Sequence, residues 1–214
     1  MLVWRLALGA VFIGGIASLC WADYHAQPPG VWLFLLAALL AFAASHELIG
    51  MMAARLFQPA RWPIYLGNLA MVAANGYGHF QSLKGTGPFE LPAAAFVLAV
   101  LVVFVVEMVR YREPGRSTGQ LATAILALAY VGWLTTFLIQ LGFVGGNRMG
   151  MAALVTLILV VKMCDIGAYT VGRLFGRHKM TLRLSSGKTI EGLIGGLSFA
   201  CIASWCAFKW LVPA

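Results

Sequence analysis

Charged residues are scarce in this sequence, and acidic residues are the scarcest. Charged residues make up 10% of the 214 residues, and 7 Asp and Glu stand against 15 Lys and Arg. Because 61% of the residues are hydrophobic, so few charges cannot cover the surface of a water-soluble globule. The composition argues against a soluble enzyme, and also against a nucleic-acid-binding protein, which would need a soluble basic face.

Cysteines are also few, and their spacing does not suit a metal site. The 4 cysteines are Cys20, Cys164, Cys201 and Cys206, and all fall in or at the end of apolar runs. We interpret them as small buried hydrophobic residues. The chain also lacks a linker, a low-complexity tract, an internal repeat and a clean signal-peptide cleavage site. We therefore expect a retained first helix and a single integral-membrane domain over residues 1–214.

Long apolar runs are what the chain has in abundance. A helix of about 20 apolar residues can cross a bilayer core of roughly 30 Å. The sequence predicts an all-α polytopic membrane protein with about seven transmembrane helices. They lie near residues 3–22, 31–52, 63–81, 91–109, 119–141, 149–168 and 190–212. The third run is the most polar, because Asn68, Asn75 and Gly76 interrupt it, and the sequence allows a short or tilted helix there.

The positions of the basic residues indicate the orientation. Cytoplasmic loops of membrane proteins carry most of the Lys and Arg. With a cytoplasmic N-terminus, 11 of the 15 fall on the cytoplasmic side: Arg5, Arg55, Arg61, Arg110, Arg112, Arg116, Arg173, Arg177, Lys179, Arg183 and Lys188. This bias supports both the number of spans and a cytoplasmic N-terminus.

Asp165 lies near the cytoplasmic end of the sixth run, where an ionisable side chain is costly. A carboxylate at membrane depth suggests a functional role. An ion pair with Lys162, three residues earlier on the same helix, would explain it equally well. The residues alone leave both interpretations open.

Two other acidic residues inside apolar runs have simpler explanations. Glu107 and Arg110 are spaced three apart and predict an interfacial ion pair. Glu47, which follows His46 in the second run, fits a structural contact between helices better than direct chemistry.

Glycines follow Asp165 at regular spacing. Gly172 and Gly176 have the spacing that lets two membrane helices pack closely. Glycines also let the backbone approach a phosphate chain. We favour the second interpretation because of the charged residues around them.

A basic cluster then precedes the last apolar run. Arg173, Arg177, His178, Lys179, Arg183 and Lys188 lie within 16 residues of one another, with no acidic residue between them. A solvated cytoplasmic loop accounts for two or three such charges. Arg can bind phosphate through two parallel hydrogen bonds, and Lys supplies a compact positive charge. The cluster therefore predicts an anion site in a basic loop.

The residues before the last run predict the start of a helix. Thr189 is placed as its N-cap and Glu191 in its first turn, so free backbone N–H groups would lie beside Lys188. The Gly187-Lys188-Thr189 sequence is not a P-loop, because the upstream glycine is misplaced and no strand precedes it.

In these elements the chain resembles the phosphatidate cytidylyltransferases, the membrane enzymes also called CDP-diacylglycerol synthases. The matching elements are Asp165-x-Gly167-Ala168-Tyr169, Gly172-Arg173-x-Phe175-Gly176-x-His178-Lys179 and Ser185-x-Gly187-Lys188-Thr189-x-Glu191-Gly192-x-x-Gly195-Gly196. The family usually has Pro where this chain has Ser186. The resemblance covers the whole chain, and residues 165–196 are its diagnostic part.

The resemblance implies transfer of CMP from CTP to phosphatidic acid, which gives CDP-diacylglycerol and pyrophosphate in phospholipid biosynthesis. It implies a divalent metal, Mg²⁺, held by Asp165, and catalytic roles for Lys188 and Lys179. It implies substrate binding by Arg173, Arg177, His178, Ser185, Gly187, Thr189 and Glu191. The implied partners are CTP, phosphatidic acid and membrane lipid, with no nucleic acid and with a homo-oligomer left open. The implied location is the inner or plasma membrane of a bacterium, with the basic loop facing the cytoplasm.

Members of the family also carry an acidic motif beyond the matching segment, and this motif does not occur in the 214 residues. We therefore expect a piece of the enzyme or a shortened homologue, with activity that depends on that motif. Two alternatives remain. One is a non-catalytic membrane protein that binds anionic lipid or nucleotide through the basic loop. The other is a CTP-dependent lipid or polyprenol kinase.

Overall fold

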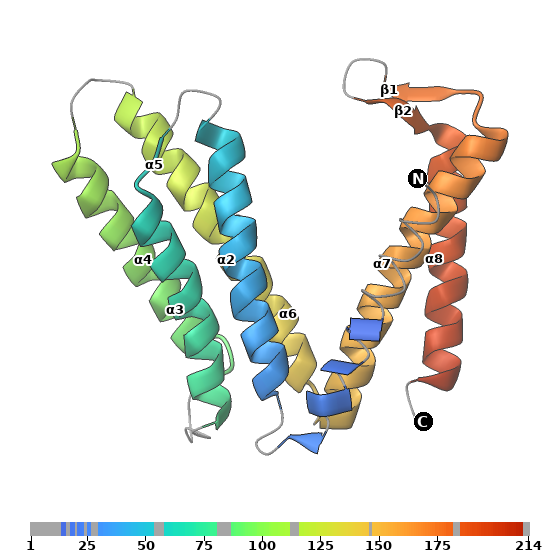
Figure 1. The fold of residues 1–214 in the computed structure, drawn as a ribbon, viewed down its shortest axis with the longest axis horizontal. Helices are drawn as coiled ribbons and strands as arrows, with labels where there is room; N and C mark the ends of the chain where they lie inside the picture. The colour runs from blue at the N-terminus through green and yellow to red at the C-terminus, as the bar shows by residue number, and fades with distance from the viewer. Residues whose placement is uncertain are drawn as a thin grey trace. The chain divides into compact units, whose positions relative to one another are not determined.

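The computed structural model describes most of the chain as two compact units. The described residues are 14–15, 18–19, 21–23, 25–26, 30–53, 58–80, 87–111, 116–145, 147–181 and 185–211. Unit 1 is Met1–Leu141 and unit 2 is Gly142–Ala214. We describe each unit by itself (Figure 1).

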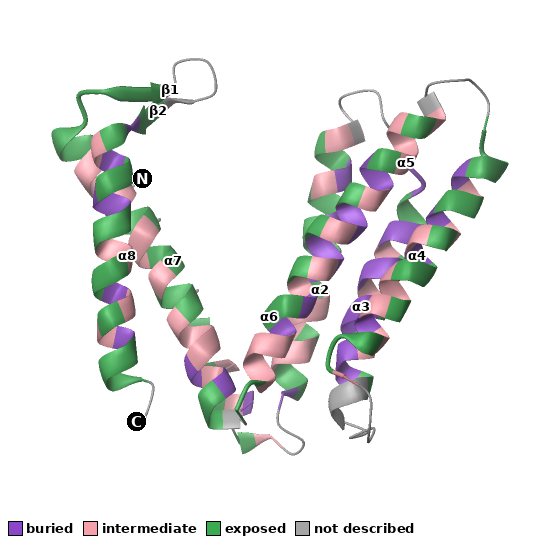
Figure 2. Ribbon diagram, turned by 180° about the vertical axis from the view of Figure 1, so that it is seen from behind, coloured by how far each residue is buried: buried purple, intermediate pink, exposed green. Residues whose placement is uncertain are grey.

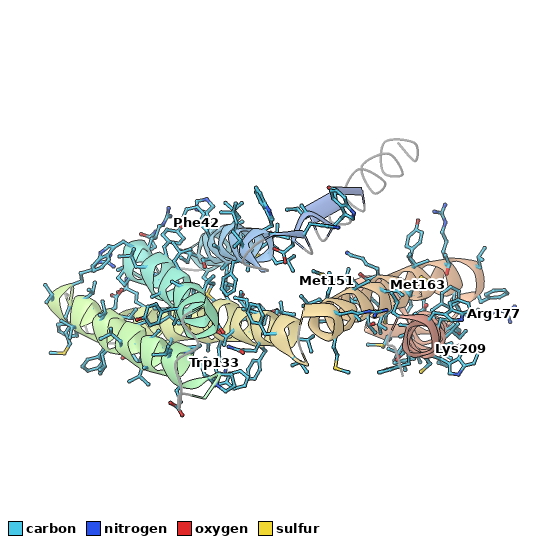
Figure 3. The ribbon with its side chains drawn as sticks, turned by 90° about the horizontal axis from the view of Figure 1, so that it is seen from below. Phe42, Trp133, Met151, Met163, Arg177 and Lys209 are labelled. Atoms are coloured by element: carbon cyan, nitrogen blue, oxygen red, sulfur yellow. The ribbon has the colours of Figure 1, made fainter. Side chains whose placement is uncertain are left out.

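Unit 1 is a helical bundle built around α3. Its helices are α2 (Val31–Ala53), α3 (Arg61–Phe80), α4 (Glu90–Val109), α5 (Arg116–Ala127), the π-helical turn η1 (Leu128–Trp133) and α6 (Leu134–Phe143). Gly142 and Phe143, the last residues of α6, belong to unit 2. Helix α3 packs against α2, α4 and η1. The buried core includes Ile64 and Met71 of α3, Val103 of α4 and Leu128 of η1. The ring centre of Trp133, labelled in Figure 3, lies 5.6 Å from the ring centre of Phe96 on α4.

Five helices of the described ranges are long and apolar enough to cross a membrane. They are Val31–Met52, Glu90–Val109, Ser117–Phe143, Arg148–Phe175 and Ile190–Trp210. Each overlaps one of the seven predicted spans, so an all-α integral-membrane protein is confirmed at this level. The predicted span 3–22 falls largely outside the described residues. Helix α3 forms where span 63–81 is predicted but is not among the five, so seven spans remain a prediction.

The polar residues that interrupt the third predicted span are buried and bonded to other helices. Asn68 Nδ2 donates to Ser45 Oγ of α2 at 2.7 Å. Asn75 Nδ2 donates to Thr136 Oγ1 of α6 at 3.2 Å, and Gln140 Nε2 donates to Asn75 Oδ1 at 2.8 Å. Hydrogen bonds between helices are a main source of association in lipid, where apolar burial contributes little. The polarity of α3 therefore reflects its central position in unit 1.

Large apolar side chains cover the outside of the helices. Figure 2 shows exposed residues along α4 and α8, and many of these residues are large and apolar. Leu98 is 63% exposed and Trp205 is 64% exposed. Such a surface is stable next to lipid and not next to water.

Unit 2 is a pair of helices joined by a β-hairpin. Helix α7 (Asn147–Phe175) packs along α8 (Ile190–Trp210), and strands β1 (Lys179–Thr181) and β2 (Ser185–Thr189) lie between them in sequence. The strands are antiparallel, with Lys179 opposite Thr189. Figure 1 shows the hairpin at one end of the helix pair.

Two sequence expectations about this region are wrong. The predicted span ends at residue 168, whereas α7 continues to Phe175, so residues 169–175, expected in the loop, are helical. Packing against α8 holds the glycines of this stretch in helical conformation despite their low propensity. Residues Lys179–Thr181 and Ser185–Thr189 form the two strands of a hairpin, which the sequence does not signal because the strands are short and polar.

Glycines at the interface allow α7 and α8 to approach closely. A Cβ on Gly167 would lie 2.7 Å from the carbonyl oxygen of Gly195, and a Cβ on Gly195 would collide with the side chain of Val171. These contacts are too short for any larger residue. Gly167 and Gly195 are therefore packing contacts between the two helices.

We expect Gly195→Ala to lower the free energy of unfolding by about 1–3 kcal/mol, because it overpacks the interface with Val171. Thermal unfolding of the detergent-solubilised protein, followed by circular dichroism, measures this. Gly50→Ala is the matched control, since a Cβ on Gly50 meets nothing within 4 Å. Equal stability of the two variants would show that close packing of α7 on α8 does not depend on Gly195.

Candidate functional site

A cleft of about 620 Å³ lies in unit 2 between α7, the hairpin and the first turn of α8. This volume lies within the usual range of small-molecule sites. Its α7 lining is Asp165, Ala168, Tyr169, Gly172 and Arg173. Its other lining residues are Met180, Gly187, Lys188, Thr189, Gly192 and Leu193.

The α7 side of the cleft is one face of a helix. Asp165, Tyr169 and Arg173 follow one another at intervals of four residues, so they lie above one another on that face. Arg173 Nη1 donates to the Tyr169 hydroxyl at 2.6 Å, and its guanidinium carbon lies 5.9 Å from the centre of the Tyr169 ring. Tyr169 thus fixes the position of one cation of the cleft.

The opposite side is the start of α8. Thr189 is extended, with φ −122° and ψ 154°, and its Oγ1 accepts from the backbone N–H of Gly192 at 3.1 Å. This confirms Thr189 as the N-cap and Glu191 in the first turn. The remaining free N–H groups and the helix dipole make this end attractive to anions.

Helix α7 comes very close to this helix start. A Cβ on Gly172 would lie 3.1 Å from Thr189 Oγ1 and 3.4 Å from Gly192 Cα. Gly172 and Gly192 also line the cleft. These two glycines therefore allow close helix packing and also leave space in the cleft. Helix packing and close approach to a ligand are compatible at these positions.

We expect Thr189→Ala to cost about 0.5–2 kcal/mol of stability, because the N–H of Gly192 loses its acceptor. Thr189→Ser keeps an Oγ and should retain most of that stability. Thermal unfolding of the two variants in the same detergent measures the difference. If Thr189→Ser is as unstable as Thr189→Ala, the loss comes from the missing methyl group and not from the cap.

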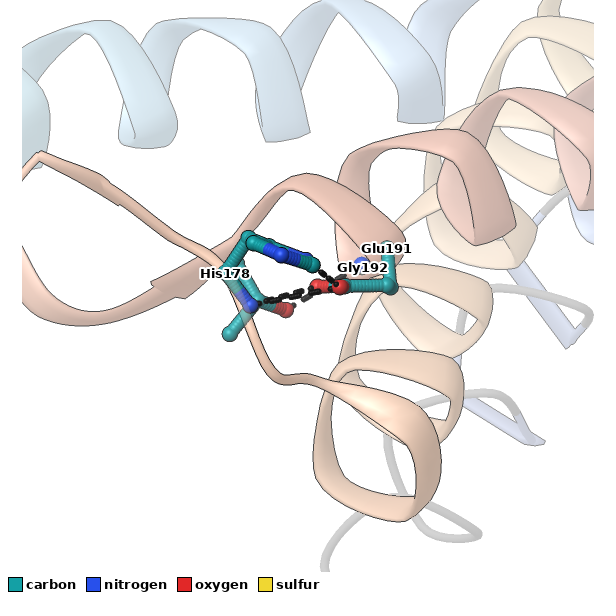
Figure 4. A network of polar contacts seen from close by, with 4 residues as sticks. His178, Glu191 and Gly192 are labelled. Atoms are coloured by element: carbon teal, nitrogen blue, oxygen red, sulfur yellow. Dashed lines mark hydrogen bonds and ion pairs between the residues drawn. The ribbon is translucent and has the colours of Figure 1, made fainter.

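His178 and Glu191 hold the hairpin to the start of α8 (Figure 4). Glu191 accepts from the backbone N–H of His178 at 3.2 Å, and His178 Nδ1 lies 2.7 Å from Glu191 Oε1. The backbone N–H of Ile190 donates to the His178 carbonyl at 3.0 Å. Neither His178 nor Glu191 lines the cleft. Their contacts position the hairpin, on which Lys188 lies.

Asp165 and Lys188 are exposed and unpaired within the part of the chain that the structure describes. In particular, Asp165 makes no ion pair with Lys162, although both residues are described. The ion-pair explanation of Asp165 is therefore wrong. Both side chains line the cleft and are available to a ligand.

The cleft brings together half of the site residues that the sequence predicts. Asp165, Arg173, Gly187, Lys188 and Thr189 line it. Arg177, His178, Lys179 and Glu191 lie outside its lining. Ser185 belongs to β2, but its side chain falls outside what the structure describes. Tyr169 is the residue that sequence reasoning missed, and the signal was its spacing of one helical turn from both Asp165 and Arg173.

Asp165 is the one carboxylate among the described residues that line the cleft. Within the described ranges, no three His, Cys, Asp or Glu side chains lie close enough together to hold a metal. Mg²⁺ commonly binds through one or two carboxylates, with water and substrate phosphates as its other ligands. The cleft suits Mg²⁺ in that mode.

Comparison with known proteins gives consistent matches. A model described as the cytidylyltransferase family matches residues 4–214. A phosphatidate cytidylyltransferase of Pseudomonas aeruginosa is 36% identical over 173 residues, covering 67% of this chain and 59% of the relative. One from Staphylococcus saprophyticus is 29% identical over 171 residues, covering 78% of this chain and 59% of the relative. The chain thus spans 59% of the length of these two curated relatives.

Proposed function

This chain belongs to the cytidylyltransferase family, and we propose that it transfers CMP from CTP to phosphatidic acid, giving CDP-diacylglycerol and pyrophosphate. The observation that carries the proposal is the cleft of unit 2. It places Arg173, Lys188 and the start of α8 around one space, with Asp165 on the same wall as Arg173. Three sources of positive charge and one carboxylate suit a metal-bound polyphosphate.

The reaction needs charge stabilisation more than covalent chemistry. A phosphate oxygen of phosphatidic acid attacks the α-phosphorus of CTP, the bond from that phosphorus to the bridging oxygen breaks, and pyrophosphate leaves with the electron pair. Negative charge grows on the leaving pyrophosphate. Lys188 and Arg173 are positioned to bind phosphate oxygens in the cleft and to stabilise this charge. The N-terminal N–H groups of α8 add fixed partial positive charge.

The remaining predicted residues have supporting roles in this proposal. Arg177 and Lys179 are exposed on the hairpin side, and we assign them to contacts with the outer phosphates. The hydrogen bonds between His178 and Glu191 support a positioning role for this pair.

Lipid has access to the cleft from the bilayer. Leu193 lines the cleft and is 49% exposed, and Ile166, next to Asp165, is also 49% exposed. Both belong to candidate membrane spans. A phospholipid could keep its acyl chains along these surfaces while its phosphate enters the cleft. The excess of basic residues at this end supports a cleft that faces the cytoplasm from a bacterial inner membrane.

Mg²⁺, where it binds, would be held by Asp165 together with substrate phosphates. It would supply neutralisation of the triphosphate charge. Arg173 and Lys188 would bind phosphate oxygens directly, beside the carboxylate of Asp165.

Labelled CTP tests the proposal on the 214-residue chain in vesicles that contain phosphatidic acid. Transfer of label from the α-phosphate of CTP into lipid supports CMP transfer. Transfer from the γ-phosphate alone would show a CTP-dependent kinase. If CTP binds but neither label enters lipid, this chain acts as a non-catalytic binding protein.

A further inference from the structure

Unit 1 contains a second polar recess, of about 330 Å³, that shares no residue with the cleft of unit 2. It lies where α2 and α4 end and α3 begins. Its lining residues are Ile49, Gln58, Pro59, Ala60, Arg61, Trp62 and Arg110. Two of these side chains are guanidinium groups, and none is acidic.

A buried carboxylate builds the wall of this recess. Glu107 of α4 is 3% exposed, and its Oε1 accepts from the backbone N–H of Ala60 at 2.7 Å and from Arg110 Nη1 at 3.2 Å. The ion pair predicted from the spacing of Glu107 and Arg110 is thus confirmed. Gln120 Nε2 of α5 donates to the Gln58 carbonyl at 3.3 Å and holds the same segment. The recess therefore has fixed walls, and the carboxylate of Glu107 is directed into the protein.

The two arginines of the recess have N–H groups that make no hydrogen bond to a described residue. Arg61 makes no hydrogen bond or ion pair with any residue that the structure describes, and Arg110 uses one of its five N–H groups on Glu107. Arg61 and Trp62 are the first residues of α3, so the positive end of that helix faces the same space. Paired guanidinium groups at a helix start suit the phosphate of a monoester or diester.

The recess lies at the depth of lipid headgroups. Arg110 follows directly after Val109, the last residue of a candidate membrane span, and Val109 is 83% exposed. Trp62 and Tyr111 are 54% and 57% exposed, and such aromatic residues are typical of the membrane interface. Basic pockets between helices at this level bind anionic headgroups.

We propose that this recess binds the phosphate of an anionic phospholipid, at a site separate from the unit 2 cleft. The two arginines bind the phosphate oxygens, and Trp62 packs at the headgroup boundary. Glu107 does not contact the lipid but keeps Arg110 and the 58–60 segment in place.

Lipid retention by the purified full chain tests this proposal. The protein is extracted from membranes that contain phosphatidylglycerol and phosphatidylcholine, and the lipids retained on each chain are counted by native mass spectrometry. We expect phosphatidylglycerol to be retained and Arg61→Gln to weaken its binding roughly fivefold or more, with a larger loss in the double variant with Arg110→Gln. Arg148→Gln, which removes an exposed arginine of α7, should retain phosphatidylglycerol as the unchanged protein does.

Two controls keep the test decisive. Arg61→Gln breaks no bond to a described residue, so its fold should be intact by circular dichroism even where the Arg110 variant is unstable. Added inorganic phosphate measures whether a free ion competes for the same site. Three results would each overturn the proposal of a phospholipid site. They are phosphatidylglycerol retention that is unchanged in Arg61→Gln, retention of phosphatidylcholine equal to that of phosphatidylglycerol, and complete displacement of the lipid by inorganic phosphate.

Discussion

Replacement of Lys188 by Met is expected to lower CMP transfer about 100- to 1,000-fold, the loss seen when one preorganised charge-stabilising donor is removed. Lys188 lines the cleft beside the start of α8 and has no partner among the described residues. Its charge is therefore free to act on the substrate, and it has no fold contact whose loss would confuse the result. Methionine keeps the length of the side chain and removes the charge.

The measurement is the rate at which label from the α-phosphate of CTP enters lipid, together with CTP binding by equilibrium dialysis. Lys209→Met is the matched control, since Lys209 lies in the last turn of α8, with its Nζ 5.1 Å from the centre of the Trp205 ring. Equal rates for the two variants would remove Lys188 from the site. Loss of CTP binding as large as the loss of rate would make Lys188 a binding residue without a specific effect on transfer.

Asp165→Asn is expected to raise the Mg²⁺ concentration needed for half-maximal CTP binding and transfer by roughly 10- to 100-fold, at least the effect of losing a supporting group around a metal. Asparagine keeps the shape of the side chain but lowers its affinity for a hard cation, which prefers charged oxygen ligands. Because Asp165 makes no ion pair with Lys162, the substitution breaks no salt bridge between described residues.

A titration with Mg²⁺ at fixed CTP concentration separates the possible outcomes. Glu90→Gln serves as the matched control, because it removes an exposed acid in the first turn of α4 in unit 1. A curve shifted to higher Mg²⁺ only in Asp165→Asn supports the metal role. An equal loss of CTP binding and transfer at every Mg²⁺ concentration would show that Asp165 acts on the nucleotide or the lipid without the ion.

Features that depend on neighbours along the chain were predictable from the sequence. The positions of five membrane spans follow from the length of apolar runs, because a bilayer demands about 20 consecutive apolar residues. The N-cap at Thr189 and the pair of Glu107 with Arg110 follow from spacing within one helix turn. The cap and the ion pair each involve residues that are four or fewer positions apart.

Features that depend on a second helix were not predictable from the sequence. Gly172 allowed either ligand approach or helix packing, and the position of α8 places it both at a close helix contact and in the lining of the cleft. Asn68 and Asn75 looked like interruptions of a span, whereas their partners on α2 and α6 make them contacts of a buried helix. The partner residues are 23 and 61 positions away, so no local pattern reveals them.

The sequence by itself determined that this is a helical membrane protein and predicted that its chemistry lies between Asp165 and Gly196, because both inferences rest on composition and on a local order of residue types. The tertiary structure decided which of those residues share one space. The approach of α7 to α8 puts Asp165, Arg173 and Lys188 around a single cleft, and it commits His178 and Glu191 to holding the hairpin. Only the close packing of glycine-lined helices allows that arrangement, since side-chain volume and distance are properties of the folded chain.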